Sequence, residues 1–294
     1  MQYTSLSQYL KNEYGEKYQK LALSCSLSCP NRDGVCGTKG CIFCSQKGSG
    51  DFAQDALADV DSQIEKAKEL VKRKNDSDKY IAYFQSFTST YGNVQYLKDI
   101  FYKAISRNDI AILSIATRPD CLQDEILEII KELNKIKPVW VELGLQTIHE
   151  STANYIRRGY ETAVYFDAVK NLKAIGVHII THIIIGLPYE TKEMMVQTAY
   201  AVGKVTDGVK LQLLHVLKNT DLEKEFCDKK FDVLTLEDYA DIMCECINAM
   251  PQDVVVHRIT GDGNKNELIA PLWSRDKKRV LNFINHKIAK YERT

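Results

Sequence analysis

Short apolar runs alternate with longer amphipathic segments over most of the chain. The apolar runs lie at 19–26, 78–85, 110–117, 138–146, 176–188 and 208–217. Most are separated by segments with helical spacing of apolar positions, such as "DEILEIIKELNKI". Strands that alternate with helices in this way are typical of parallel βα units. Since "HIIIGL" is apolar at nearly every consecutive position, we expect strands that are covered on both faces.

The six strands predict an α/β fold with a partial (β/α)6 barrel over residues 19–218 and a short N-terminal extension over residues 1–18. Beyond the barrel the pattern changes. An amphipathic helix begins at Thr235, "DVVVHRI" has the character of a short strand, and a basic helix follows. We therefore expect residues 219–294 to form a cap of helices and a strand on the last barrel strand, and no independent domain.

Composition and charge narrow the function classes. Hydrophobic residues make up 45% and charged residues 27% of the 294 residues, which is typical of a globular protein with a sizeable core. The formal net charge is zero, so the overall balance indicates neither nucleic acid nor an anionic membrane, although a local basic patch stays compatible with RNA. The sequence has no apolar leader and no long uncharged apolar segment, so we expect a cytoplasmic protein with no membrane partner.

Cysteines are the most distinctive feature, because five of the nine lie in one stretch, "SCSLSCPNRDGVCGTKGCIFC". Clustered thiols in a chain without a secretion signal indicate metal or redox chemistry more often than disulfides. On count alone, zinc could bind four of them, Cys29, Cys36, Cys41 and Cys44. The alternative is a four-iron cluster on three thiolates, which leaves one iron open to a small ligand.

Two of the five thiols have ordinary interpretations. Cys25 continues the alternation of Leu21 and Leu23, which predicts a small buried apolar residue at the end of a strand. Cys36 lies in "DGVCGTKG", whose turn-forming residues predict an exposed bend. We expect neither to be a metal ligand.

The segment "SCPNRDGVCGTKGCIFCSQKGSGDF" resembles the radical S-adenosylmethionine (SAM) proteins of the YhcC/YtqA-like family. That family is in the same class as the elongator catalytic subunit and oxygen-independent coproporphyrinogen oxidase. The resemblance continues through "YIAYFQSFTSTYG", "SIATRPDCL", "VWVELGLQT" and "HIIIGLPYET". It implies a radical SAM barrel, a [4Fe-4S] cluster held by Cys29, Cys41 and Cys44, and S-adenosyl-L-methionine on the open iron.

The resemblance also implies contacts with S-adenosylmethionine. Phe43 would pack near the adenine, Gln146 would contact the ribose, and Arg158 would pair with the methionine carboxylate, which suits the fork of a guanidinium. The methionine amino group would be met by residues of "FQSFTS", namely Gln85, Ser86 and Thr88.

Further polar residues lie in or near the predicted strands. Arg118 and Glu142 either line the cavity as catalytic groups or form a structural ion pair. His182 is expected to be a satisfied core histidine. A polar substrate wall could be formed by His215, Lys218, His257 and Arg258.

The implied reaction is cleavage of S-adenosylmethionine to a 5′-deoxyadenosyl radical, with flavodoxin or ferredoxin as reductant. Kinship within the class points to tRNA, with wobble 5-carboxymethylaminomethyl-(2-thio)uridine converted to 5-aminomethyl-(2-thio)uridine. No segment resembles the acetyltransferase domain of the elongator subunit, so we expect no acetyl-CoA chemistry. Basic residues that could contact phosphates are Arg275, Lys277, Lys278, Arg279, Lys287, Lys290 and Arg293.

Two alternatives remain open at this point. One is a radical SAM decarboxylase or dehydrogenase of a porphyrinogen-like small molecule. The other is a metal-binding regulator without enzymatic activity.

Overall fold

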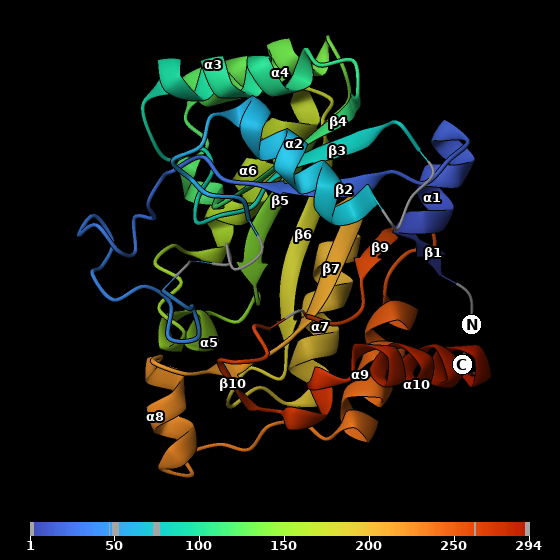
Figure 1. Cartoon of the computed structure of the whole chain (residues 1–294). Coiled ribbons are helices and arrows are strands. Elements are labelled where there is room, and N and C mark those ends of the chain that lie inside the picture. Colours follow the sequence, from blue (N-terminus) through green and yellow to red (C-terminus); the bar gives the residue numbers. More distant parts are fainter. Residues whose placement is uncertain (1–2, 47, 49–52, 73–76, 262, 292–294) are drawn as a thin grey trace.

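The barrel consists of parallel strands that curl into an open half-barrel with helices outside it (Figure 1). The computed structural model describes residues 3–46, 48, 53–72, 77–261 and 263–291. Six strands run in chain order across the sheet, as the apolar runs predict, which confirms the α/β barrel class. They are β2 (Gln19–Leu23), β3 (Tyr80–Phe84), β4 (Ile110–Thr117), β5 (Val139–Gln146), β6 (His178–Ile185) and β7 (Gly208–Leu213).

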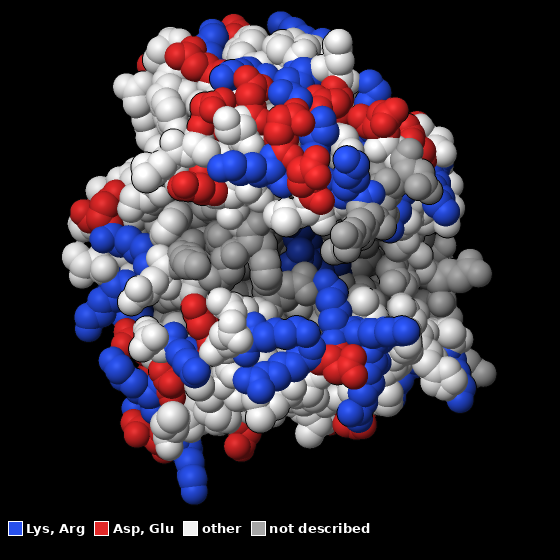
Figure 2. Space-filling model, in the orientation of Figure 1, with Lys and Arg blue, Asp and Glu red and all other residues white. Residues whose placement is uncertain are grey.

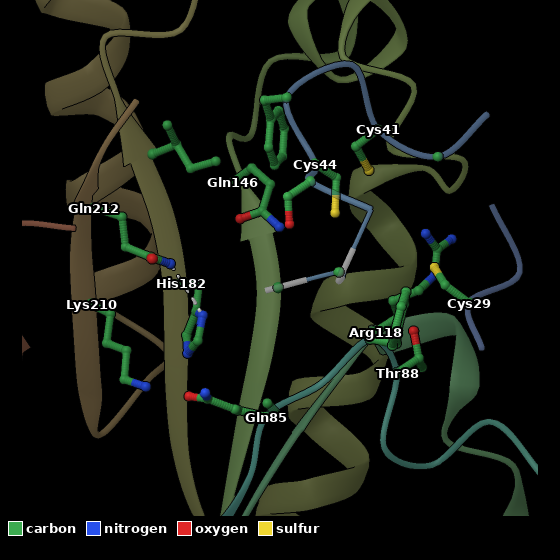
Figure 3. Close-up of a pocket in the computed structure, with 18 of the residues that line it drawn as sticks. Cys29, Cys41, Cys44, Gln85, Thr88, Arg118, Gln146, His182, Lys210 and Gln212 are labelled. Carbon is green, nitrogen blue, oxygen red and sulfur yellow. Dashed lines mark hydrogen bonds between the residues drawn. The ribbon is translucent and has the colours of Figure 1, made fainter. Parts of the chain in front are cut away.

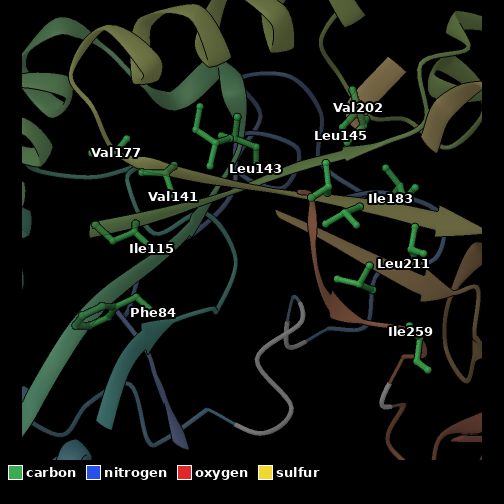
Figure 4. Packing of buried hydrophobic residues seen from close by; sticks show 14 of the residues in the cluster. Phe84, Ile115, Val141, Leu143, Leu145, Val177, Ile183, Val202, Leu211 and Ile259 are labelled. Carbon is green, nitrogen blue, oxygen red and sulfur yellow. The ribbon is translucent and has the colours of Figure 1, made fainter. Parts of the chain in front are cut away.

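Helices cover the outer face of this sheet, and several begin at a capping side chain. Asp59, Asn93 and Thr191 each accept a hydrogen bond from a backbone N–H in the first turn of the helix that follows. The apolar faces of these helices and of the strands share one core (Figure 4). The covering helices are α2 (Val60–Val71), α3 (Val94–Ile105), α4 (Asp124–Asn134), α6 (Thr162–Ala174) and α7 (Lys192–Gly203).

The sheet is larger than the sequence predicts, because both ends of the chain extend it. Strand β9 (Val255–Arg258) pairs in parallel with β7, and β1 (Thr4–Ser5) pairs in parallel with β9. The cap strand therefore lies within the sheet, and the N-terminal extension lies against the cap. Strand β1 has two residues, too few to carry a periodic signal.

The first helix, α1 (Leu6–Tyr14), closes the interior of the barrel at the amino ends of the strands. Its one fully buried side chain, Leu10, packs with Ile81, Ile112, Trp140 and Ile180 in a cluster separate from the main core. One end of the barrel is thus filled by apolar side chains.

We expect Leu10→Ala to lower the free energy of unfolding by about 2 to 3 kcal/mol, the lower part of the range for buried leucine, because a short helix can shift into the cavity. Chemical denaturation measures this loss. The exposed neighbour Lys11 is the control, since Lys11→Ala should stay within about 0.5 kcal/mol of the wild type. Equal effects of the two substitutions would contradict the conclusion that Leu10 of α1 fills this end of the barrel.

The cap contains the predicted helix from Thr235, whose hydroxyl accepts a hydrogen bond from the Asp238 N–H. Sequence patterns missed α1, α5 (Glu150–Tyr155), α8 (Asp221–Cys227) and the antiparallel pair β8 (Val216–Leu217) and β10 (Leu268–Ala270), all of them short.

None of the helices in the described ranges is long and apolar enough to cross a membrane. Arg293 lies outside the described residues. The remaining cap elements are α9 (Leu236–Ala249), the 3-10 turn η3 (Leu272–Arg275) and α10 (Lys277–Lys290). A further 3-10 turn, η2 (Pro119–Cys121), follows β4.

Candidate active site

A cavity of about 280 Å³ lies at the carboxyl ends of the barrel strands, where βα barrels bind their ligands. The cysteine loop, residues 24–46, follows β2 and covers one side of it. Cys29, Cys41 and Cys44 all line this cavity, and none of the three forms a disulfide. In Figure 3 they lie on the side opposite Lys210 and Gln212.

The other two thiols of the loop lie elsewhere, as the sequence predicts. Cys25 is buried in the main core, and burial raises the pKa of its thiol to about 12. Cys36 is exposed. In the described part of the chain, no three His, Cys, Asp or Glu side chains are grouped to hold a single metal ion. The zinc alternative therefore gains no support, whereas a four-iron cluster attaches each thiolate to a different iron.

Burial, and then the nearby Cys44, raises the pKa of the Cys41 thiol to about 12. This thiol is therefore protonated at neutral pH in the absence of a ligand. Iron and zinc bind thiolates, so a metal at this position must displace a proton.

Two side chains of the "CPNRDG" stretch shape the cysteine loop. The Asn31 amide donates to the carbonyls of Arg157 and Arg158, at 2.7 and 3.0 Å, and lies 3.4 Å from the Cys41 sulfur. The Arg32 guanidinium donates to the carbonyls of Cys44 and Ser45, at 3.3 and 2.6 Å. Asn31 therefore connects the cysteine loop to the turn after α5. Arg32 connects the first half of the loop to its C-terminal end.

Glycines permit these close approaches. Gly40 has φ +75°, and a Cβ on it would lie 3.0 Å from the Arg32 Nε. Gly159 has φ +82°, and a Cβ there would lie 2.4 Å from the Asn31 Oδ1. Backbone hydrogen bonds from Ile42 to Ile156 and from Leu222 to Ile42 fix the "CIFC" turn between α5 and α8.

Five of the residues expected to contact S-adenosylmethionine line the cavity: Phe43, Gln85, Thr88, Gln146 and Arg158. Gln146 has φ +71°, an unusual conformation for a residue with a side chain. Its Oε1 and the Thr88 Oγ1 are buried, and within the described ranges they have no hydrogen-bond partner. Buried polar atoms normally have partners, so these two oxygens fit a bound polar ligand. Ser86 is buried and is not among the lining residues.

The guanidinium of Arg158 is surrounded by acceptors of the protein itself. The residue is 2% exposed. Its Nε and Nη1 donate to the carbonyls of Tyr160, Leu145 and Thr147, and its Nη2 is taken by Thr162 and Glu150. All five donors of a guanidinium are then used. Arg158 holds the turn after β5 together, and these contacts lend no support to its pairing with the methionine carboxylate, which stays a prediction.

Arg118 lines the same cavity and keeps donors available. Its Nε and Nη2 bind the Asp120 carboxylate at 2.9 and 2.7 Å, and its Nη1 donates to the Arg158 carbonyl at 2.9 Å. Three of its five donors are engaged in these contacts. Arg118 is therefore partly a structural ion pair and partly a cavity residue.

The interior of the barrel below the cavity carries a charged group that we call the polar floor. Glu142 is at its centre and is 0% exposed. The carboxylate accepts from Lys20 at 2.7 Å, from Ser114 at 2.8 Å and from His182 at 2.6 Å, and it also contacts Lys210. The polar floor consists of Lys20, Tyr83, Glu142, His182, Lys210 and Arg258.

The pKa values in the polar floor follow from burial and these contacts. Burial alone raises the pKa of Glu142, but Lys20 and Lys210 outweigh it and hold that pKa well below its usual range. Burial lowers the pKa of Lys210 well below that of a free lysine, and Glu142 offsets only part of this. Burial, and then Lys210, lowers the pKa of His182 to about 4. The imidazole is therefore neutral at pH 7 and donates from Nε2.

Two of the four residues of the predicted polar wall line the cavity. His215 and Arg258 line the cavity. Lys218 is exposed, and His257 packs against Trp140; neither is a lining residue. His182 is satisfied by Glu142 and by Gln212, at 3.2 Å, as expected of a core histidine, but it also faces the cavity.

Sequence patterns missed Lys20, Tyr83, Lys210 and Asn31. A lysine inside the apolar run "GVKLQLL" is a signal for Lys210, because a charge in a buried strand needs a partner. The position of Asn31 directly after Cys29 and Pro30 is a signal for a loop-shaping role.

Comparison with known proteins identifies the family. Residues 32–200 match the model of the radical SAM superfamily, and residues 206–290 match that of the radical SAM C-terminal domain. The chain belongs to the radical SAM superfamily. Proteins of this superfamily use a [4Fe-4S] cluster and S-adenosylmethionine, and the three cysteines of the cavity and the oxygens of Thr88 and Gln146 suit both.

Relatives agree with this assignment to the radical SAM superfamily. YtqA of Bacillus subtilis is 42% identical over 287 residues, which covers 97% of this chain and 89% of YtqA. The tRNA uridine(34) acetyltransferase of Methanocaldococcus infernus is 26% identical over 155 residues, or 51% of this chain and 28% of that protein. The structure of Elp3 from M. infernus has the same fold, with a TM-score of 0.67 and 18% identity over 92% of this chain and 63% of Elp3. The chain thus spans less than two thirds of these last two proteins.

Proposed function

We propose that this radical SAM protein is a tRNA-modifying enzyme whose [4Fe-4S] cluster is held by Cys29, Cys41 and Cys44. The observation that carries the proposal is that these three thiols line one cavity together with the unpartnered oxygens of Thr88 and Gln146. Reductive cleavage of S-adenosylmethionine at such a cluster supplies a 5′-deoxyadenosyl radical, which removes a hydrogen atom from an unactivated carbon.

The residues of the cavity then bind and orient the cofactor. We assign the adenine to the face of Phe43, and the ribose and amino groups to Gln146, Gln85 and Thr88, with Ser86 supporting the turn after β3. We assign the methionine carboxylate to Arg118, which keeps donors and lies close enough to Cys29 for their charges to interact. Arg158 positions the turn beneath them.

The proposed substrate is wobble uridine of tRNA. Support comes from the partial similarity to a tRNA uridine(34) acetyltransferase and from the basic side chains near the opening. Figure 2 shows Lys and Arg atoms within the central hollow and more of them below it, over the region of β10 and α10. Cationic side chains around an opening suit contacts with phosphates.

The proposed reaction removes the carboxymethyl group of 5-carboxymethylaminomethyl-(2-thio)uridine. Loss of a hydrogen atom and then of one electron from the methylene between nitrogen and carboxylate gives an iminium, and loss of the N–H proton gives the imine. Water hydrolyses the imine to 5-aminomethyl-(2-thio)uridine and glyoxylate. The substrate gives up one electron, and cleavage of S-adenosylmethionine consumes one electron. Flavodoxin or ferredoxin is therefore needed only to start the cycle. Both are cytoplasmic, as we propose for this enzyme.

The test combines cells and purified enzyme. tRNA from a deletion strain should accumulate the carboxymethylaminomethyl nucleoside and lack the aminomethyl product in nucleoside analysis. The reduced holoenzyme should release 5′-deoxyadenosine, glyoxylate and the aminomethyl nucleoside in equal amounts. Unchanged wobble nucleosides in both experiments would contradict the RNA substrate, and absence of 5′-deoxyadenosine release would favour a regulator.

A further inference from the structure

We propose that Gln212 is a specificity-determining residue, whose side-chain amide pairs with the N–H and the neighbouring carbonyl of a uracil base. The inference rests on the proposed function in one respect, since it takes the substrate to be a modified uridine. The chemistry of the site itself requires only a planar ring with an N–H next to a carbonyl group.

Gln212 lies at the carboxyl end of β7 and lines the cavity. Side chains alternate along a strand, so Gln212 points to the same face of the sheet as Lys210. On the neighbouring strand β6, Ile184 is matched with Gln212, and His182 is matched with Lys210. In Figure 3, Gln212 lies next to His182 and across the cavity from the labelled cysteines. Gln212 is therefore placed to contact a substrate and not the proposed cluster.

Hydrogen bonds fix which way the Gln212 amide is turned. The His182 Nε2 lies 2.6 Å from the Glu142 carboxylate, which is ionised and only accepts, so Nε2 carries the hydrogen of the neutral ring. The Nδ1 of the same ring is then an acceptor. The Gln212 Nε2 lies 3.2 Å from this Nδ1 and donates to it. The reverse orientation would bring the carbonyl oxygen of Gln212 against a second acceptor.

The fixed amide keeps one donor and one acceptor for a ligand. Among the described residues, the one hydrogen bond of the Gln212 side chain goes to His182. An amide nitrogen has two hydrogens, so one N–H and the Oε1 remain. Together they complement the N3–H and O4 of uracil. A cytosine in the same position presents the opposite order, with an acceptor at N3 and a donor at N4.

The surroundings of Gln212 suit the flat faces of a base. Ile184, beside it on β6, and Leu214, which follows β7, line the cavity and belong to one apolar cluster. Apolar walls with a few fixed polar groups are typical of pockets that bind small planar ligands. A ligand that covers the amide without pairing with it leaves polar groups unsatisfied, which lowers its affinity.

The experiment compares three anticodon stem-loops on the holoenzyme. One carries 5-carboxymethylaminomethyluridine at the wobble position, and the others carry the matching cytidine or the matching 3-methyluridine, which lacks the N–H. The wild type should bind the uridine at least about tenfold more tightly than either, as expected of a bidentate pair. Gln212→Leu should bring the ratio of uridine to cytidine close to one, and an unchanged ratio would overturn the proposal. Lys218→Ala is the control and should keep the ratio, because Lys218 is exposed and does not line the cavity.

His182→Phe tests the orientation of the amide separately. The substitution keeps a ring but removes the acceptor of the Gln212 N–H, so the amide can turn over and pair with either base. The preference for uridine over cytidine should therefore be lost, whereas the preference over 3-methyluridine should stay. A purely structural role of His182 would weaken the binding of all three stem-loops alike and would contradict this assignment.

A second set of probes contains no RNA and separates this inference from the proposed function. Uridine should raise the melting temperature of the wild type more than cytidine or 3-methyluridine does, and Gln212→Leu should lack this difference. If the wild type binds the three stem-loops equally, the role of Gln212 is overturned and the tRNA substrate stands. If it binds none of them, the tRNA substrate fails and the nucleosides decide: equal shifts, or none, overturn the role of Gln212.

Discussion

Alanine at Cys29, Cys41 or Cys44 is expected to abolish iron binding by the reconstituted protein. All three thiols line one cavity, and a four-iron cluster held by three thiolates has no spare ligand to replace the one removed. The wild type should contain about four iron atoms per chain and absorb near 400 nm, as such clusters do. Each of the three variants should lose both signals, and with them the release of 5′-deoxyadenosine.

The matched controls are the other two thiols of the same loop. Cys36→Ala should keep the iron of the wild type, because Cys36 is exposed and does not line the cavity. Cys25→Ala should keep it as well, at some cost in stability, because Cys25 is buried in the main core. Loss of iron in Cys36→Ala would mean that the ligand set is wrong.

Glu142→Gln is expected to lower the free energy of unfolding by about 3 to 5 kcal/mol, the cost of breaking a buried ion pair. The substitution leaves Lys210 and Lys20 next to a neutral amide at a position that is 0% exposed. Denaturation of the protein without its cluster at neutral pH measures the loss. The pKa of Glu142 is lowered on folding, so its contribution is complete above the unfolded pKa of about 4.3 and is lost as pH falls further.

The double variant E142Q/K210M separates charge from packing. Removing both members of the pair leaves no uncompensated charge between them, so the double variant should be more stable than Glu142→Gln alone. A double-mutant cycle gives the coupling free energy. If the losses from the two single substitutions simply add, the contact of Lys210 with Glu142 does not stabilise the fold.

The order of the barrel strands could be predicted because buried parallel strands carry an unmistakable apolar run, as in β6 (His178–Ile185). The places of the extra strands β1 and β9 in the sheet could not be predicted in this way. Strand β1 has two residues, and its partner β9 lies at the far end of the chain. Helix α1 carries few apolar positions, since only Leu10 is fully buried, so its role as a plug depends on the curled sheet beneath it.

In the site, the three thiols that we propose as cluster ligands were predicted from a motif, which is a local property of the chain. The residues of the polar floor, in contrast, lie far apart in the sequence. Lys20, Glu142, Lys210 and Arg258 come from β2, β5, β7 and β9, and they meet because the sheet curls. Arg158 shows what a motif leaves out, because a motif supplies a residue type but not the acceptors that surround it.

The pairing of β1 with β9 has a consequence for biosynthesis. Thr4 is matched with Val255 in the sheet, so β1 has no edge to join until the segment around Val255 has left the ribosome. During translation we expect the N-terminal segment to remain unattached and the barrel to remain open at the end that α1 later seals. A contact between such distant parts of the sequence forms slowly, so closure of the barrel is expected to be a late event in folding.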